Sequence, residues 1–590
     1  MSKPIEDYAL LSSLHCAALV ARDGSIDWFC PGRFDAPACF SALLGDARHG
    51  YWSIAPRDAL AGSHRHYQAD TLVLETHFET AGGSVRILDA MPMGPACHII
   101  RLVEGISGTV TMQMACHPRF HFGKHAPRLH RESGQQIIFQ CQEERLFLNS
   151  DLELTPGDAG AESVFALHAG EQHWFVLSYS NADQRAPDLP DPRQALVECA
   201  DRWRDWISRC DYRGRWESAV RRSLITLKAM IYMPTGGMVA APTTSLPEVP
   251  GGSANYDYRF CWLRDTAFAL VVLLNEGFRN EACHWRDWLL KIMDLHDEPL
   301  HALYTLEATV APPEELLDWL PGYADSRPVR TGNAANRQYQ LDVRGELMEI
   351  LHLARKHGLD LRDEIWALQC DIMSHLETRW REPDTGIWEF RTLCDHLTHS
   401  KVLSWVAFDR CIKDAETFGF DAPLDRWRRL RDDIRTDILE HGVDPEGGHF
   451  TQRYGNPEVD ASLLMIPLMG FLPADDPRML ATIEVIERHL CEDGLVRRYR
   501  SGDQANEEGL FLACCFWLAD NYCLSGRQAD AERLFERLLS LANDVGLLAE
   551  EYDPRRQVQL GNFPQGLSHL GLISTAKLIA KASEADVDLT

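Results

Sequence analysis

The chain has 590 residues, of which 45% are hydrophobic, 25% charged and 9% aromatic. These are ordinary values for a globular protein, and they exclude a disordered chain, a collagen-like repeat and a small disulfide-bonded scaffold. The 59 Lys and Arg residues against 87 Asp and Glu residues give a net charge of −28. Because this charge repels the phosphates of nucleic acids, we expect no nucleic-acid partner.

The amino-terminal segment and the cysteines indicate a cytoplasmic protein. No positively charged segment precedes an apolar core and a small-residue cleavage site, so we expect no signal peptide. No run approaches about 18 consecutive apolar residues, so we expect no membrane partner. The 17 cysteines are odd in number and include no C-x-x-C pair. We therefore predict neither structural zinc nor disulfide bonds.

Short apolar runs separated by turn residues fill the first third of the chain. Residues 72–78 and 84–88 flank the turn Ala81-Gly82-Gly83, which predicts a strand, a tight turn and a second strand. Similar runs occur at 98–103, 108–114, 136–142 and 174–179. Many closely spaced strands without a long helical pattern predict an N-terminal β-sandwich over residues 1–193.

After Pro192 the apolar spacing changes to three and four residues, which is typical of helices. We expect a helical linker over residues 194–213 and a helical catalytic domain over residues 214–590. The expected helices of this domain span residues 215–233, 264–277, 280–295, 337–357, 361–380, 399–418, 424–440, 459–470, 476–490, 506–524, 528–543 and 565–582.

The connections between these helices alternate in length. The links after the even-numbered helices are short, whereas long loops follow the odd-numbered helices, so all long loops should lie at one end of the domain. Six such hairpins can close into an (α/α)₆ barrel, although a helical solenoid would show the same alternation. The absence of a motif repeated between hairpins favours the closed barrel. At about 100–200 residues per domain, the length of the chain suggests about three to four domains. A barrel can exceed this size as a single domain, so we expect fewer.

The long loops carry carboxylates, arginine and aromatic side chains, whereas phosphate-binding loops, zincin motifs and the G-x-S-x-G motif are absent. Glycoside hydrolysis needs one protonated and one ionised carboxyl group. Glu389, between Trp388 and Phe390, is a candidate acid because removal from water favours a protonated carboxyl. Glu550, after three apolar residues, is a candidate base. Each acid alone is compatible with a surface or helix-capping residue, but several acid-bearing loops on one face favour a joint site.

In these segments the chain resembles glycoside hydrolase family 15, the inverting α-glucosidases that include glucoamylases, isomaltose-releasing exo-enzymes and bacterial trehalases. The resemblance covers nearly the whole chain. Its segments are residues 5–8, 22–28, 241–248, 262–265, 332–342, 386–389, 460–464, 507–509 and 561–565. Their order and number, rather than any single segment, make the resemblance specific. It implies an N-terminal β-sandwich followed by an (α/α)₆ barrel.

The resemblance also implies roles for individual residues. Glu389 matches the general acid and Glu550 the general base, with the adjacent Glu551 as an alternative for the base. Arg264 and Asp265 match the pair that holds the non-reducing glucose. The further residues expected to bind substrate are Trp262, Tyr258, Trp388, Arg498, Glu551 and Gln338.

The resemblance predicts an inverting exo-hydrolase that releases β-glucose from a small α-glucoside. We assign no cofactor and no metal. We favour trehalose as the substrate, with isomaltose and malto-oligosaccharides as close alternatives. A glycoside phosphorylase of the same architecture would use phosphate in place of water, and a non-catalytic carbohydrate-binding protein would yield no product. The sequence is compatible with a homo-oligomer.

Overall fold

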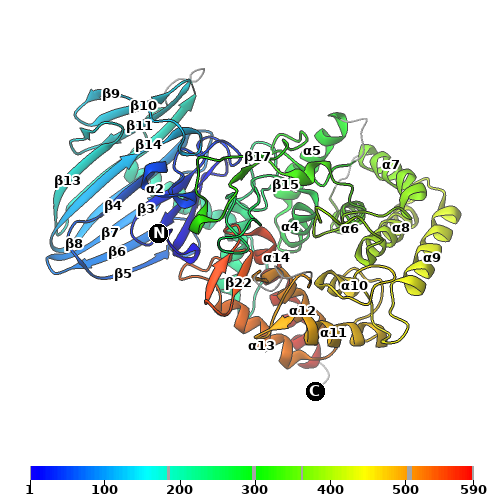
Figure 1. Cartoon of the computed structure of the whole chain (residues 1–590). Helices are drawn as coiled ribbons and strands as arrows, with labels where there is room; N and C mark the ends of the chain where they lie inside the picture. Colours follow the sequence, from blue (N-terminus) through cyan, green and yellow to red (C-terminus); the bar gives the residue numbers. More distant parts are fainter. Residues whose placement is uncertain (1, 182–186, 296–299, 360–362, 501–507, 588–590) are drawn as a thin grey trace.

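The computed structural model describes residues 2–181, 187–295, 300–359, 363–500 and 508–587. An N-terminal β-sheet domain lies beside a ring of helices (Figure 1). The strands of the sheet domain are β1 (Tyr8–Ser12), β2 (Ala17–Ala21), β3 (Ser25–Phe29), β4 (Tyr51–Pro56), β5 (Leu60–Tyr67), β6 (Leu74–Thr80), β7 (Gly83–Ala90), β8 (Cys97–His117), β9 (Arg128–Ser133), β10 (Gln136–Cys141), β11 (Glu144–Ser150), β12 (Thr155–Pro156), β13 (Ala161–His168) and β14 (Gln172–Asn181).

Strand β8 joins the two layers of this domain. Its first part pairs with β7 and β14, and its second part pairs with β4 and β13. The two runs expected at 98–103 and 108–114 are thus one continuous strand of 21 residues. Gly108 lies within it at a φ of 62°, and a Cβ atom there would stand 2.1 Å from the carbonyl oxygen of Gly82. Only glycine therefore fits where β8 passes from one layer to the other. Because β8 pairs with strands of both layers, the β-sandwich expected from the sequence is confirmed.

The helical linker is α2 (Pro192–Ile207), which begins where Asp191 accepts a hydrogen bond from the N–H of Gln194 and Pro192 takes the first position. The barrel helices are α3 (Glu217–Ala229), α4 (Leu263–Asn275), α5 (Arg279–Leu295), α6 (Asp342–Lys356), α7 (Asp363–Arg379), α8 (Thr398–Phe418), α9 (Leu424–His441), α10 (Met465–Leu468), α11 (Pro477–Leu490), α12 (Leu512–Leu524), α13 (Gln528–Ser540) and α14 (Gly566–Val587). The exact domain boundaries at residues 193 and 214 stay a prediction.

Contacts between alternate helices close the barrel. Within the described residues α4 contacts α6, α6 contacts α8, α8 contacts α10, α10 contacts α12, α12 contacts α14, and α14 contacts α4. A solenoid would leave its first and last helices apart, so the expected (α/α)₆ barrel is confirmed. Each helix of this inner ring follows a long loop. The long loops therefore gather at the N-terminal ends of the inner helices.

Several expected helices differ in extent from those observed or begin outside the described residues. The eighth is only a 3₁₀ turn, η6 (Ala461–Leu464), followed by the short α10, because Pro467 lacks an N–H and Gly470 has a φ of 72°. Residues 334–337 form a separate 3₁₀ turn before α6. The fifth and tenth expected helices each begin in segments, 361–362 and 506–507, that lie outside the described residues.

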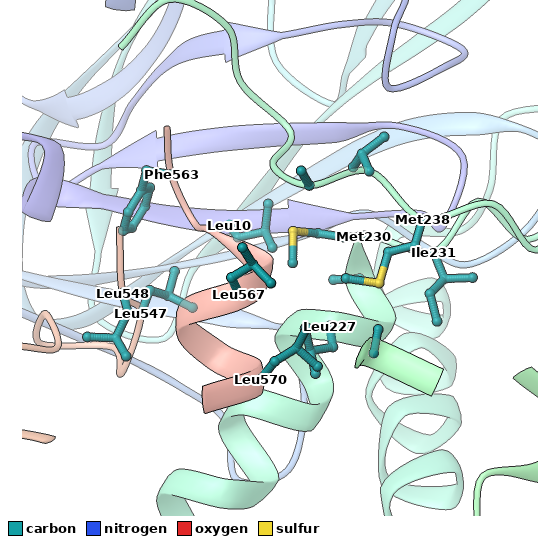
Figure 2. Packing of buried hydrophobic residues seen from close by; sticks show 14 of the residues in the cluster. Leu10, Leu227, Met230, Ile231, Met238, Leu547, Leu548, Phe563, Leu567 and Leu570 are labelled. Atoms are coloured by element: carbon teal, nitrogen blue, oxygen red, sulfur yellow. The ribbon is translucent and has the colours of Figure 1, made fainter. Parts of the chain in front are cut away.

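The sheet domain packs against the loops of the barrel. Leu10 of β1 belongs to the same buried cluster as Leu227 of α3, Met230 directly after α3 and Leu567 of α14 (Figure 2). The indole N–H of Trp28 donates to the carbonyl of Pro242 at 2.8 Å, in the loop before α4. The first domain thus supports a loop that leads to the inner ring. No helix among the described residues combines the length and the apolar character that a membrane crossing needs.

Candidate active site

A tight turn before α8 presents Glu389. The carboxylate of Asp384 accepts hydrogen bonds from the N–H groups of Leu341 at 2.9 Å and Gly386 at 3.2 Å and from the hydroxyl of Ser400 at 2.9 Å. Gly386 and Glu389 both have positive φ, at 62° and 54°. A residue other than glycine in this region costs about 1–3 kcal/mol, and such strain concentrates at functional sites. Glu389 is therefore held where a relaxed chain would not place it.

Hydrogen-bond donors surround the Glu389 carboxyl group. The indole N–H of Trp262 donates to Oε1 at 2.7 Å and the amide of Gln340 to the same oxygen at 3.4 Å, while Nη2 of Arg264 lies 3.8 Å from it. The amide of Gln338 donates to the backbone carbonyl of Glu389 at 3.0 Å. The side chain is 20% exposed. It thus faces solvent and donors instead of being enclosed by its aromatic sequence neighbours.

The second candidate carboxyl group belongs to Glu550, which is buried just before β22 (Glu551–Asp553). The hydroxyl of Tyr258 donates to Oε1 of Glu550 at 2.6 Å, and the N–H of Asn562 donates to Oε2 at 3.3 Å. Burial raises the pKa of Glu550 to about 7, against the opposing effects of the Arg498 charge and of these hydrogen bonds. A carboxyl group with this pKa exchanges protons near neutral pH.

One segment holds both carboxyl groups. Tyr258 and Trp262 pack edge to face, with ring centroids 5.4 Å apart. Tyr258 donates to Glu550 and Trp262 donates to Glu389. The rigid aromatic pair therefore fixes where the two carboxyl groups lie relative to each other.

Arg498 contacts three further carboxylates near Glu550. Its guanidinium group donates to Glu248 and to Glu508 at 2.6 Å, and lies 3.7 Å from Oε1 of Glu551. Ligand oxygens of these three glutamates lie within 4.8 Å of one another, a spacing that a cation could bridge. The Arg498 guanidinium already supplies positive charge at this place, so the arrangement is explained without a metal ion.

The cavity has two adjoining chambers, which share four lining residues. The outer chamber has a volume of about 250 Å³ and the inner one about 50 Å³. Tyr258, Trp388, Glu389 and Arg498 line both chambers. The outer chamber is also lined by Glu248, Tyr256, Asn333, Gln338, Arg391, Tyr499 and Glu508, and the inner one by Trp262, Arg264, Asp265, Ile387, Phe511, Trp517, Glu550 and Gln565. Glu389 thus stands at the junction, and Glu550 lines the inner chamber.

The inner chamber contains unsatisfied polar atoms at the start of α4. Arg264 and Asp265 are buried and form an ion pair with Nε and Oδ2 3.3 Å apart. Within the described part of the chain neither of these two atoms makes a hydrogen bond. Since buried polar groups are normally hydrogen-bonded, this pair is suited to bind the hydroxyl groups of a ligand.

A protein-family model matches the residues that form the barrel. The model for "Glycosyl hydrolases family 15" matches residues 214–577, which is more than half of the chain. The chain belongs to glycosyl hydrolase family 15. It is a glycoside hydrolase, and the resemblance inferred from its sequence is confirmed. A second model, described as "Trehalase-like, N-terminal", matches residues 1–151 of this family 15 protein.

Relatives match along nearly the whole chain. A trehalase of Mycolicibacterium smegmatis is 36% identical over 618 aligned positions, covering 98% of this chain and 92% of that protein. A trehalase of Thermoplasma volcanium is 35% identical over 592 positions, covering 98% and 94%. Among solved structures, a bacterial glucoamylase complexed with acarbose covers 98% of this chain and 94% of its own, with a TM-score of 0.73 and 12% identity. That structure supports the fold of a β-sheet domain followed by a helical barrel.

The family 15 cavity contains nearly all side chains expected from the sequence. Glu551 lines neither chamber but lies against Arg498. Several lining residues were not among the predicted site residues, including Tyr256, Arg391, Phe511 and Trp517. Arg391 follows Glu389 by two positions and could have been found from that proximity. Trp517 lies within the mostly apolar α12, where nothing in the sequence distinguishes a cavity wall from the core.

Proposed function

We propose that the protein hydrolyses trehalose by a single displacement with inversion, using Glu389 as general acid and Glu550 as general base. The observation that carries this proposal is the position of Glu389 at the junction of the chambers, with Glu550 in the inner chamber. An exo-acting enzyme needs its acid beside the bond that breaks and its base near the far face of the terminal sugar. The inner chamber then holds that sugar and the outer chamber the leaving sugar.

The reaction moves one proton at each carboxyl group. Glu389 donates its proton to the glycosidic oxygen as the bond from this oxygen to the anomeric carbon breaks. A water molecule attacks that carbon from the opposite face, and Glu550 takes a proton from the water. Tyr258 and Asn562, which donate to Glu550, keep its acceptor oxygens in place. Arg264 and Asp265 bind hydroxyl groups of the terminal glucose.

Two observations support trehalose as the substrate. The relatives from Mycolicibacterium smegmatis and Thermoplasma volcanium, which match over 98% of the chain, are trehalases. The outer chamber carries carboxylate, amide and guanidinium groups from Glu248, Gln338 and Arg391, which suit a leaving sugar rich in hydroxyl groups. The neighbouring Glu551 is a weaker candidate for the base, because it lines neither chamber.

An anomer-resolved NMR time course tests the mechanism. Inversion at one glucose of trehalose yields one β-glucose, while the leaving glucose keeps its α configuration, so both anomers should appear initially in equal amounts. Retention would give only α-glucose at first and would refute the proposal. Isomaltose and maltose, run in parallel, should be cleaved more slowly, and glucose 1-phosphate formed only with added phosphate would indicate a phosphorylase.

Replacing Glu389 by Gln tests the acid. The variant keeps the shape of the side chain but cannot donate the proton, so we expect kcat on trehalose to fall by about 10²- to 10⁴-fold. Circular dichroism should show an unchanged fold. Near-normal turnover by this variant would remove Glu389 from the acid role.

A further inference from the structure

The segment beginning at Asp460 belongs to the sequence resemblance but has no role in the mechanism above. Asp460 is buried and directly precedes η6. Its Oδ2 accepts hydrogen bonds from the indole N–H of Trp388 at 2.8 Å and the amide of Gln452 at 3.3 Å, and its Oδ1 accepts one from the hydroxyl of Ser462 at 2.6 Å. Three donors thus hold one carboxylate against a wall of the cavity.

Trp388 links this carboxylate to the strained turn. It immediately precedes Glu389, whose φ is 54°. Its ring centroid lies 6.2 Å from that of Tyr499, 6.0 Å from that of Phe511 and 6.3 Å from that of Trp517. These ring contacts fill the space around the indole but set no direction for its N–H group. The hydrogen bond to Asp460 supplies that direction.

Asp460 also connects the turn to the loop that carries Arg498. Its backbone forms a β-bridge with Tyr499, and the N–H of the next residue, Ala461, donates to the carbonyl of Arg498 at 2.8 Å. A shift of Asp460 would therefore move the turn that carries Glu389 relative to Arg498. Glu389 and Arg498, one from each of these loops, line both chambers.

We propose that Asp460 is a positioning residue for the general acid: by holding the indole of Trp388, it keeps Glu389 aimed at the glycosidic oxygen. This inference rests on the proposed function, in which Glu389 is the acid. Asp460 lines neither chamber and so acts through Trp388 instead of contacting the substrate. A carboxylate suits this task because a hydrogen bond to a charged acceptor is shorter and stronger than a neutral one.

The test compares two substrates of the Asp460→Asn variant. Trehalose needs a proton on its leaving oxygen, whereas α-D-glucosyl fluoride loses fluoride with little help from an acid. A catalytic group displaced by about 1 Å lowers the reaction rate by about 100-fold. We therefore expect kcat on trehalose to fall by about 10- to 100-fold, with KM nearly unchanged. On α-D-glucosyl fluoride the loss should be about twofold or less, because inner-chamber binding and the base are intact.

Two outcomes would overturn the inference. Equal losses on both substrates would mean that Asp460 only maintains the fold, and unchanged turnover of trehalose would mean that it positions nothing. The matched control is Asp520→Asn, which changes an equally buried aspartate of α12 that lines neither chamber, and it should keep wild-type rates on both substrates.

Glu389→Gln, measured beside it, separates this inference from the proposed function. If Glu389→Gln cleaves trehalose normally, the proposed function fails. If Glu389→Gln is inactive on trehalose while Asp460→Asn is normal, only the inference fails. If Asp460→Asn does not fold, Gln452→Met removes one donor to Asp460 and changes no residue that lines either chamber. It should show a smaller loss of the same selective kind on trehalose, and equal losses on both substrates would again overturn the inference.

Discussion

Replacing Tyr258 by Phe removes the shortest hydrogen bond to Glu550, at 2.6 Å, and leaves the N–H of Asn562 at 3.3 Å. Burial raises the pKa of Glu550 to about 7, and the Tyr258 hydroxyl opposes this rise because it stabilises the ionised form. A hydrogen bond to a charged group contributes about 1.5–3 kcal/mol. At 1.36 kcal/mol for each pKa unit, its loss should raise the pKa of Glu550 further by about 1 to 2.

The sign of the effect on activity follows from the proposed role of Glu550 as general base. A base must be ionised, so activity is lost as the pH falls through its pKa, and a higher pKa moves this loss to higher pH. The assay is kcat/KM for trehalose against pH, which reports the groups of the free enzyme. In Tyr258→Phe the acidic limb should move up by about 1 to 2 pH units. The control Tyr256→Phe, in the outer chamber only, should not move it. An unmoved acidic limb in Tyr258→Phe would refute the reasoning.

Two further predictions concern stability. Arg498→Met leaves the buried carboxyl groups of Glu248 and Glu551 and the half-buried one of Glu508 without their cation. The free energy of unfolding in urea should therefore fall by about 3–5 kcal/mol, and adding Glu248→Gln should restore part of it. An unchanged urea midpoint would contradict this. Burial raises the pKa of Asp520 from 3.8 to about 7, so its neutral form stabilises the fold at low pH and this contribution is lost as the pH rises through about 7. In the wild type, the free energy of unfolding should therefore fall by about 4 kcal/mol as the pH rises, and Asp520→Asn should remove this fall. Melting temperatures that depend equally on pH in the wild type and the variant would disprove the prediction.

The sequence by itself determined the architecture, because the relevant signals are local. Apolar spacing distinguishes strands from helices, and the alternation of short and long links places the long loops at one end of the barrel. The same locality explains the error at residues 459–470, where the apolar pattern outweighed Pro467 and Gly470 in the expectation but not in the fold. Closure into a ring needed tertiary structure, since the contact of α14 with α4 joins distant segments.

Only the tertiary structure decided how the site is assembled. The bonds from Trp388 to Asp460, from Tyr258 to Glu550 and from Arg498 to Glu248 span 72, 292 and 250 residues, and no spacing rule predicts such pairs. Glu550 and Glu551 are adjacent and chemically identical, so the sequence leaves their roles open. Successive side chains near a strand point in opposite directions, and here Glu550 faces the inner chamber and Tyr258 while Glu551 faces Arg498. Packing of distant loops therefore decided which carboxyl group reaches the cavity.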